Sequence, residues 1–197
     1  KAEEIVAGME AEEEGEEGVP ERDEHVWLSL RNASIAVTEM EKVFSEVNPS
    51  NAEVYQTNAA EYQKKITELE EKYSTFFAGV TNKTILFGDR FPFRYLADDY
   101  GLTYYAAFAG CSAETESSFE TILFLAGKVD ELNLKTVYVT ETSDGKIAQT
   151  VIENTKNKDA KIVTINALQS IAGDQKDQTT YLKLMEENLK AFQDSLI

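Results

Sequence analysis

His25 is the only histidine of this chain, and its side chain is the one most suited to binding a metal. Neutral imidazole offers a lone pair at physiological pH, and histidine is the commonest metal-ligating side chain in proteins. The stretch D-E-H-V-W-L-S at residues 23–29 also contains the only tryptophan, Trp27. A single histidine beside a tryptophan is more often a packed, hydrogen-bonded structural residue. His25 is therefore a candidate metal ligand whose role depends on what surrounds it.

Two carboxylates, Asp89 and Glu141, are the next candidates because each follows an expected strand. Asp89 comes after I-L-F-G at residues 85–88, and Glu141 comes after T-V-Y-V-T at residues 136–140. Ligands of open parallel sheets bind at the carboxyl ends of the strands, so both side chains should lie on one edge. Two oxygen ligands there suit a divalent cation. Each carboxylate can also be a helix N-cap or a loop residue stabilised by a helix dipole.

The elements that must position these residues follow from the hydrophobic pattern. Short β-branched or aromatic runs at 85–87, 104–108, 136–139 and 162–165 alternate with segments of helical pattern at 93–100, 117–132, 145–155 and 178–195. Strands that are apolar on both faces and joined by helices form parallel sheets. The predicted fold class is α/β, with a parallel sheet of about four strands flanked by helices.

A long helix is predicted to precede this sheet, over residues 50 to 78. Apolar residues recur there at alternating spacings of three and four, namely Ala52, Tyr55, Ala59, Tyr62, Ile66, Leu69, Tyr73 and Phe76. Asn48 and Pro49 suit its start, and we expect the helix to lie along the globular body. A shorter helix before Asn48 should have its own apolar side, made of Ile35, Val37, Met40, Val43, Phe44 and Val47.

The chain is strongly acidic, with 36 Asp and Glu against 19 Lys and Arg and a formal net charge of −17. Eleven of these acids fall in residues 1–24, where we expect a mobile loop. An acidic chain without clusters of Lys and Arg argues against nucleic acid as a partner. No run approaches the ~20 apolar residues of a membrane span, and the single cysteine excludes an internal disulfide.

The order of these parts resembles a known family. After the acidic run come H-V-W at 25–27, N-P-x-N-A-x-x-Y at 48–55 opening the long helix, Y-G-L at 100–102 and A-G-C-S-A-E-T-E-S at 109–117. Together these motifs are similar to the metal-binding, substrate-binding proteins of bacterial zinc or manganese ABC importers. That family includes the zinc-uptake proteins and the streptococcal metal-binding adhesins.

The resemblance implies two α/β lobes joined by a rigid helix, with the metal held between them. On this basis the chain divides into an acidic loop (1–24), a remnant of the first lobe (25–48), a spanning helix (49–79) and a C-terminal α/β lobe (80–197). It also implies that most of the N-terminal lobe, with one histidine ligand, is not in this chain. We therefore expect this chain to bind metal more weakly than an intact two-lobed protein.

The resemblance assigns metal-ligand roles to three residues. His25 matches the H-V-W ligand of the family, and Glu141 matches its final carboxylate. Asp89 is the metal-binding residue type nearest to the position after the first strand where the family has His or Glu. The expected ion is Zn2+, with Mn2+ as the alternative, because one histidine and two carboxylates suit either. We expect the three side chains to converge on one point.

The predicted function is extracytoplasmic binding of this metal and its delivery to the membrane permease of an ABC importer, without catalysis. The resemblance implies a periplasmic or lipid-anchored protein at the cell surface. Two alternatives stay open, a metal-dependent hydrolase that uses Asp89 and Glu141, and an acidic adhesin or scaffold. Turnover of ester or phosphate substrates would identify the hydrolase. Binding that is sensitive to salt but not to chelator would identify the adhesin.

Overall fold

The structure, a computed structural model, describes residues 23–110, 116–171 and 178–196. Its elements are η1 (Val26–Leu28), α1 (Leu30–Val47), η2 (Pro49–Asn51), α2 (Ala52–Gly79), β1 (Thr84–Phe91), α3 (Arg94–Tyr100), β2 (Thr103–Ala109), α4 (Phe119–Glu131), β3 (Thr136–Thr140), α5 (Lys146–Glu153), β4 (Lys161–Ile165) and α6 (Tyr181–Ser195). The alternation of strands and helices is the one that the hydrophobic pattern predicts. All but the last two residues of the acidic run lie outside the described residues.

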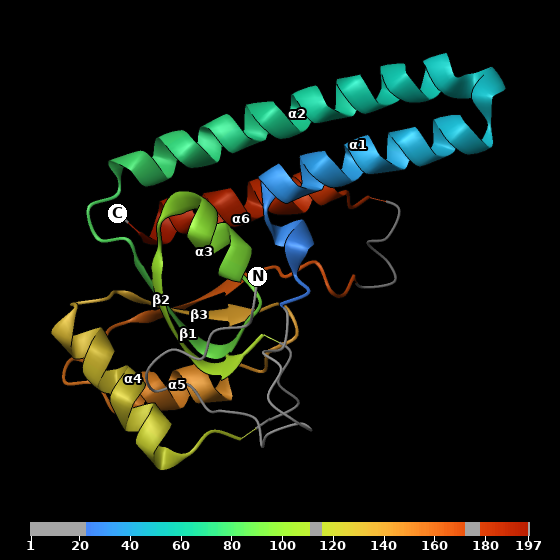
Figure 1. Cartoon of the computed structure of the whole chain (residues 1–197). Coiled ribbons are helices and arrows are strands. Elements are labelled where there is room, and N and C mark those ends of the chain that lie inside the picture. Colours follow the sequence, from blue (N-terminus) through green and yellow to red (C-terminus); the bar gives the residue numbers. More distant parts are fainter. Residues whose placement is uncertain (1–22, 111–115, 172–177, 197) are drawn as a thin grey trace.

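The four strands form one parallel sheet in the order β2-β1-β3-β4 (Figure 1). Every residue of the inner strand β3 is buried, and six of the eight residues of β1 are buried. The edge strand β4 is exposed at Lys161, Ile162 and Thr164. Strands that are apolar on both faces occupy the middle of a sheet because both faces are covered by helices. The predicted α/β fold with a four-stranded parallel sheet is confirmed.

Strand β1 continues beyond its predicted end. The sequence predicts that it stops at Phe87, but it runs to Phe91, with a register shift between Phe87 and Arg90 in its pairing with β2. A Cβ added to Gly88, within this irregularity, would lie 2.5 Å from the Cα of Ala148 on α5. Only glycine allows so close an approach of strand and helix. Asp89 therefore lies inside a strand, and not in the loop that follows it.

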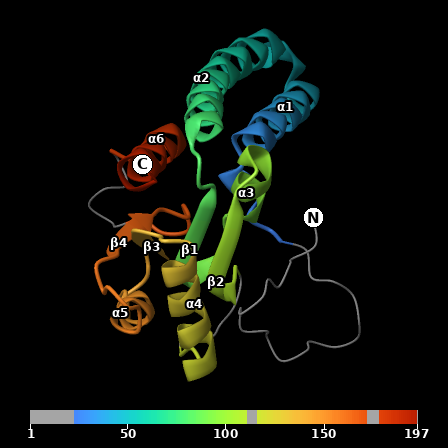
Figure 2. The same ribbon diagram turned by 90° about the vertical axis from the view of Figure 1, so that its left-hand side faces the viewer.

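Helices cover both faces of the sheet, as Figures 1 and 2 show. Helices α4 and α5 pack on one face, where Leu86, Val137 and Val139 are buried. Helices α2, α3 and α6 lie on the other face, over a larger apolar cluster that also contains Leu28 from the η1 turn. The sheet therefore has a hydrophobic core on each side, and the segment around His25 belongs to the larger one.

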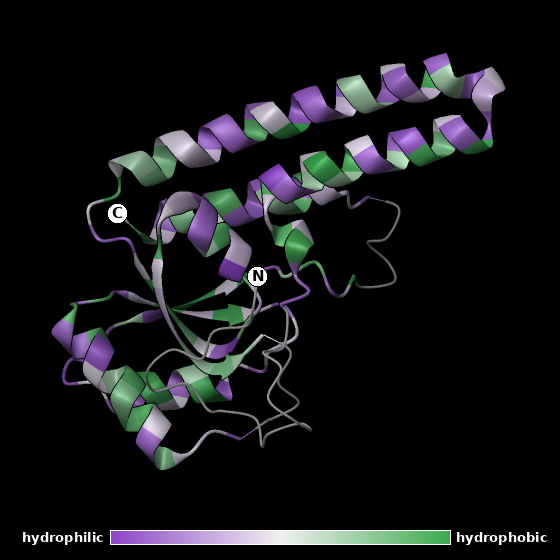
Figure 3. Ribbon diagram, in the orientation of Figure 1, coloured by the Kyte–Doolittle hydropathy of each residue, from purple (hydrophilic) through white to green (hydrophobic). Residues whose placement is uncertain are grey.

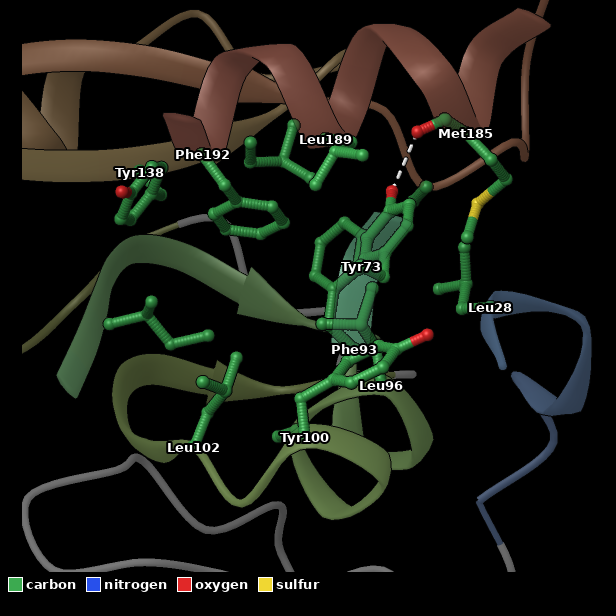
Figure 4. Packing of buried hydrophobic residues seen from close by; sticks show 14 of the residues in the cluster. Leu28, Tyr73, Phe93, Leu96, Tyr100, Leu102, Tyr138, Met185, Leu189 and Phe192 are labelled. Atoms are coloured by element: carbon green, nitrogen blue, oxygen red, sulfur yellow. Dashed lines mark hydrogen bonds between the residues drawn. The ribbon is translucent and has the colours of Figure 1, made fainter. Parts of the chain in front are cut away.

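Aromatic rings from α2, α3 and α6 fill the larger core. The ring of Tyr100 stacks at centroid distances of 5.4 Å on Tyr73 and 5.1 Å on Phe77, and Phe77 also meets Phe192 edge-on. The Tyr73 hydroxyl donates to the carbonyl of Met185 at 2.6 Å (Figure 4). Burial raises the pKa of Tyr73 well above its usual value. These contacts fix the second half of α2 on the α/β body.

Helices α1 and α2 lie side by side as a hairpin that extends away from the sheet (Figures 1 and 2). Gln63 on α2 joins them by donating to the Thr38 hydroxyl at 2.6 Å and to the Ser34 carbonyl at 3.1 Å. Helix α2 is continuous, as predicted, but its buried residues are only Ile66, Leu69, Tyr73 and Phe77. The prediction that the whole helix lies along the body is therefore wrong for its first half, which packs against α1 instead.

The predicted apolar side of the shorter helix is present on α1, but much of it is exposed in the described structure. Phe44 is 54% exposed and Val47 is 80% exposed, and Ile35, Met40 and Val43 are exposed too. Figure 3 shows hydrophobic and hydrophilic segments alternating along both helices of the hairpin. The spacing predicted which residues share a face of the helix, but it did not predict whether another element covers that face.

Candidate metal-binding site

His25 lies directly before the η1 turn, and its ring is fully buried. Its Nδ1 lies 3.0 Å from Oδ1 of Asp23, and the same oxygen accepts the backbone N–H of His25 at 2.9 Å. Its Nε2 lies 2.9 Å from Nε2 of Gln169, which is 144 residues away in the sequence. Each ring nitrogen therefore has one polar partner, a carboxylate on one side and a carboxamide on the other.

Three further hydrogen bonds tie the His25 turn to the α/β body. Tyr95 of α3 donates to the carbonyl of Asp23 at 2.8 Å, and Tyr181 of α6 donates to the carbonyl of Trp27 at 2.9 Å. The indole Nε1 of Trp27 donates to the carbonyl of Ala167, just after β4, at 3.0 Å. Burial raises the pKa of Tyr181 above its usual value, so this phenol keeps its proton. The turn is held from α3, α6 and the segment after β4 at once.

The imidazole also lies close to Gly110, the residue directly after β2. A Cβ added to Gly110 would lie 3.0 Å from Cε1 of His25 and 3.0 Å from the carbonyl oxygen of Phe91. The indole of Trp27 lies 5.3 Å from the imidazole between ring centroids. A side chain at position 110 would push against the imidazole, so the absence of a side chain at Gly110 allows the ring of His25 to occupy this place.

Asp89 is buried and is held by the end of β3. Its Oδ2 accepts the backbone N–H of Thr140 at 2.8 Å and the Thr140 hydroxyl at 2.6 Å. The other oxygen, Oδ1, lies 4.0 Å from Nη1 of Arg90. A buried carboxylate is stable only when donors or charges satisfy it, and Thr140 and Arg90 do so here. Asp89 therefore connects β1 to β3 through one oxygen.

Glu141 follows β3 directly, as predicted, and its carboxylate organises the segment after β4. Oε2 accepts the backbone N–H of Ala167 at 2.7 Å. Oε1 accepts the backbone N–H of Gln169 at 3.1 Å and that of Ser170 at 3.3 Å. Both oxygens of Glu141 are thus used by backbone donors of the segment that carries Gln169, and Glu141 sets the position of that glutamine beside His25.

The structure does not bring His25, Asp89 and Glu141 together at one point. Across residues 23–110, 116–171 and 178–196, no three His, Cys, Asp or Glu side chains lie close enough to hold one ion. The physical reason is that each side chain has a different set of partners, and Nε2 of His25 contacts the side-chain amide of Gln169 rather than either of the two carboxylates. The predicted convergence is therefore wrong for this structure, while the ligand role of each residue stays a prediction.

Gln169 is the residue of this site that the sequence analysis missed. It comes a few residues after β4, so the rule that selected Asp89 and Glu141 from the strand ends also applied to it. Gln169 was not selected because a glutamine amide carries no charge, although its carbonyl oxygen can coordinate divalent cations. The two ends of a glutamine amide are distinguished only by their hydrogen-bond partners, so Gln169 can present nitrogen or oxygen to its surroundings.

The chain is similar to proteins of zinc uptake. A family model described as the zinc-uptake complex component A, periplasmic (ZnuA), matches residues 1–195. The high-affinity zinc uptake system protein ZnuA of Bacillus subtilis (strain 168) is 31% identical over 176 residues, which are 89% of this chain and 54% of that protein. This chain therefore spans about half the length of that relative.

Two solved structures share the fold. The laminin-binding adhesin Lmb of Streptococcus agalactiae, in a mutant form, matches with a TM-score of 0.79 and 25% identity, over 92% of this chain and 66% of that chain. The Zn(II)-bound ZnuA-like domain of Streptococcus pneumoniae AdcA matches with a TM-score of 0.73 and 28% identity, over 89% of this chain and 64% of that chain. In both structures the similarity leaves about a third of the compared chain unmatched.

Proposed function

Because this chain belongs to the family of the periplasmic zinc-uptake component ZnuA, we propose that it binds zinc outside the cytoplasm and delivers it to the membrane permease of an ABC importer. The related B. subtilis protein is a zinc uptake protein, and the related domain of AdcA is a Zn(II)-bound one. We propose a periplasmic or lipid-anchored location for the intact protein. Among the described residues, no helix has both the length and the apolar character needed to cross a membrane.

The observation that carries this proposal is the pair of polar contacts made by the two ring nitrogens of His25. Metal-ligating histidines typically donate one ring N–H to a carboxylate or carbonyl and bind the metal through the other nitrogen. His25 has this arrangement, with Asp23 at Nδ1 and Gln169 at Nε2. We propose that Nε2 of His25 is the nitrogen ligand and that Gln169 turns its amide oxygen to the same ion. The single buried imidazole then has a direct chemical role.

The hydrogen bonds of Asp89 and Glu141 indicate which of these two carboxylates can bind the ion with the smaller loss of existing contacts. Both hydrogen bonds to Asp89 fall on Oδ2, so Oδ1 can bind an ion without breaking either of them, although the ion would then share Oδ1 with the Arg90 guanidinium 4.0 Å away. Glu141 uses both oxygens to hold three backbone N–H groups, which it would have to release before binding an ion. Ala167 is buried, so leaving its N–H without an acceptor would cost about 1–3 kcal/mol, whereas Gln169 and Ser170 are exposed and their N–H groups can turn to water. We therefore propose Asp89 ahead of Glu141.

Zinc affinity measured by chelator competition on this chain tests the ligand set. We expect His25→Ala to weaken binding on the order of 100-fold or more, because it removes the only imidazole. Gln169→Ala and Asp89→Asn should each weaken binding by less, and Glu141→Gln tests whether this carboxylate is a ligand. Asp144→Asn is the matched control because Asp144 is an exposed carboxylate at the same end of β3. Wild-type affinity in His25→Ala would contradict the proposal.

Two measurements address the choice of metal and the strength of binding. Elemental analysis of protein purified without chelator distinguishes Zn2+ from the alternative, Mn2+. Calorimetry should show weaker zinc binding by this chain than by the B. subtilis relative, because this chain spans 54% of that protein. Each missing ligand should cost several kcal/mol of binding free energy. Equal affinities would show that the residues of this chain form the whole site.

An adhesin role is the second candidate, and the likeness to Lmb favours it. Lmb is described as a laminin-binding adhesin, and this chain matches it over 92% of its own length. The net charge of −17 would attract a basic partner. Binding to immobilised laminin that falls with salt but is unaffected by chelator would support this role. Binding that disappears with the metal would instead make it a consequence of the metal-bound state.

The hydrolase alternative lacks support from the fold comparisons. The family that matches this chain is one of zinc-uptake components. A hydrolase would need Asp89 and Glu141 at one ion with an open coordination position, whereas the structure engages them with Thr140 and with the segment after β4. Zinc-dependent turnover of ester or phosphate substrates that is abolished by Asp89→Asn would restore this alternative.

A further inference from the structure

We infer that Asp23 is the positioning residue of the His25 ligand, because it holds the imidazole proton on Nδ1 and so directs the lone pair of Nε2 to the metal. This inference rests on the proposed function and adds to it the group that prepares the ligand before metal arrives. Asp23 and His25 are neighbours in one turn, and their side chains are 2% and 1% exposed. Water therefore has no access with which to replace the contact between them.

The contact between Asp23 and His25 allows only one assignment of the proton in a neutral ring. An ionised carboxylate is an acceptor only, so the ring nitrogen that lies 3.0 Å from Oδ1 of Asp23 must be the donor. A neutral imidazole has one N–H, and its other nitrogen then carries the lone pair. The tautomer selected by Asp23 is therefore the one in which Nε2 is ready to bind a cation.

Gln169 cannot make this selection, although it touches the other nitrogen. If Nε2 of His25 carries a lone pair, the amide nitrogen of Gln169 donates to it. If Nε2 carried the proton, the amide would turn over and its oxygen would accept that proton. The glutamine thus adapts to either tautomer, whereas the carboxylate of Asp23 accepts only one. Gln169 follows the state of the ring that Asp23 sets.

A purely structural role for Asp23 has to be separated from this one. Its Oδ1 also accepts the backbone N–H of His25 at 2.9 Å, which is the local turn that Asp commonly makes two residues ahead. Serine makes the same turn through its hydroxyl but is too short to reach the ring as well. Asp23→Ser therefore keeps the turn and removes the ring contact. Glu24→Ser is the matched control, because Glu24 is an exposed carboxylate one residue away.

The test combines the tautomer of His25 with zinc affinity, measured on the full chain. His25 is the only histidine, so its ring nitrogens give one pair of 15N signals in a histidine-labelled sample. At about pH 8, where an ordinary imidazole is neutral, the metal-free protein should show a protonated Nδ1 and an unprotonated Nε2. Asp23→Ser should populate both tautomers and weaken zinc binding ~10–100-fold, and Glu24→Ser should change neither.

Each outcome supports or overturns the inference. A wild-type ring protonated on Nε2, or on both nitrogens, overturns it, and so does an unchanged tautomer or unchanged zinc affinity in Asp23→Ser. If Asp23→Ser fails to fold, Asp23→Asn replaces it, because its neutral amide can donate to Nδ1 and should also populate the second tautomer. Zinc that leaves the wild-type Nε2 signal unmoved overturns the proposed function itself, whereas the metal-free spectrum reports on Asp23 alone.

Discussion

The α1–α2 hairpin has two halves that differ in what covers their apolar side chains. In the half next to the sheet, Tyr73 and Phe77 are at most 1% exposed and lie among rings from α3 and α6. In the half far from the sheet, Phe44 is 54% exposed, and its ring meets only Tyr55 among the ring pairs of the described residues, at 5.8 Å. Helical spacing is similar in both halves, so burial here depends on neighbours from distant parts of the chain.

The largest expected effect comes from truncating a ring of the covered half. Phe77→Ala should lower the free energy of unfolding by about 3–5 kcal/mol, because it opens a cavity among Tyr73, Tyr100 and Phe192. Urea unfolding followed by circular dichroism measures the change. A loss below about 1 kcal/mol would show that the core next to α2 is not packed as described.

The buried phenols predict a loss of stability at alkaline pH. Burial raises the pKa of Tyr138 from 10.0 to about 12, and burial also raises the pKa values of Tyr73, Tyr100 and Tyr181. Below pH 10 these phenols are protonated in both states, and above it they ionise first in the unfolded chain. Stability is therefore complete below about pH 10 and falls as pH rises through the folded values.

Tyr138 alone should account for roughly 3 kcal/mol of this loss between about pH 10 and pH 12, at 1.36 kcal/mol for each unit of pKa difference. Urea unfolding at a series of pH values measures the slope. Tyr138→Phe keeps the ring and removes the titrating group, so its stability should fall less steeply than that of the wild type. Parallel slopes for the two proteins would show that Tyr138 is accessible to solvent.

A smaller effect is expected from removing one hydroxyl of the covered half. Tyr73→Phe keeps the ring but leaves the carbonyl of Met185 without the donor that lies 2.6 Å from it. We expect a loss of about 0.5–1.5 kcal/mol in the free energy of unfolding, the typical contribution of one hydrogen bond, because the carbonyl of Met185 lies inside α6 and keeps its place in the helical hydrogen-bond pattern. The matched change Tyr55→Phe, on the exposed half, should cost less, and an equal cost would remove the distinction between the halves.

The smallest effect is expected at the exposed half itself. Phe44→Ala repeats the chemistry of Phe77→Ala on a ring that is already half in solvent, so the stability should change by less than about 1 kcal/mol. Thermal unfolding monitored by circular dichroism is sufficient to compare the two variants. A loss as large as that of Phe77→Ala would mean that another surface covers α1 in solution, as an assembled state would provide.

The fold was predictable from the sequence to the extent that its signals are local. Short apolar runs at 85–87, 104–108, 136–139 and 162–165 all lie in parallel strands, because buried strands need apolar residues on both faces. The extension of β1 through Gly88 to Phe91 was not predictable, because it depends on the approach of Ala148 from α5. The exposed side of α1 was missed for the same reason.

The candidate site was predictable residue by residue but not as an arrangement. The sequence singled out His25 because it is the only histidine, and Asp89 and Glu141 because they follow apolar runs. It did not show that the carboxylates hold Thr140 and the segment after β4, nor that Gln169 lies beside the imidazole. A partner 144 residues away is set by the order of the strands, which local patterns do not contain.

By itself, the sequence determined the α/β alternation and the long helix, and it limited any imidazole ligand to His25. It also contains the pair Asp23 and His25, because these residues are two positions apart and their contact is formed within one local turn. The tertiary structure decided which side of α1 stays exposed and which groups face each nitrogen of His25. The physical reason is that periodicity and turns act between near neighbours, whereas burial and the partners of a buried polar group depend on packing between distant segments.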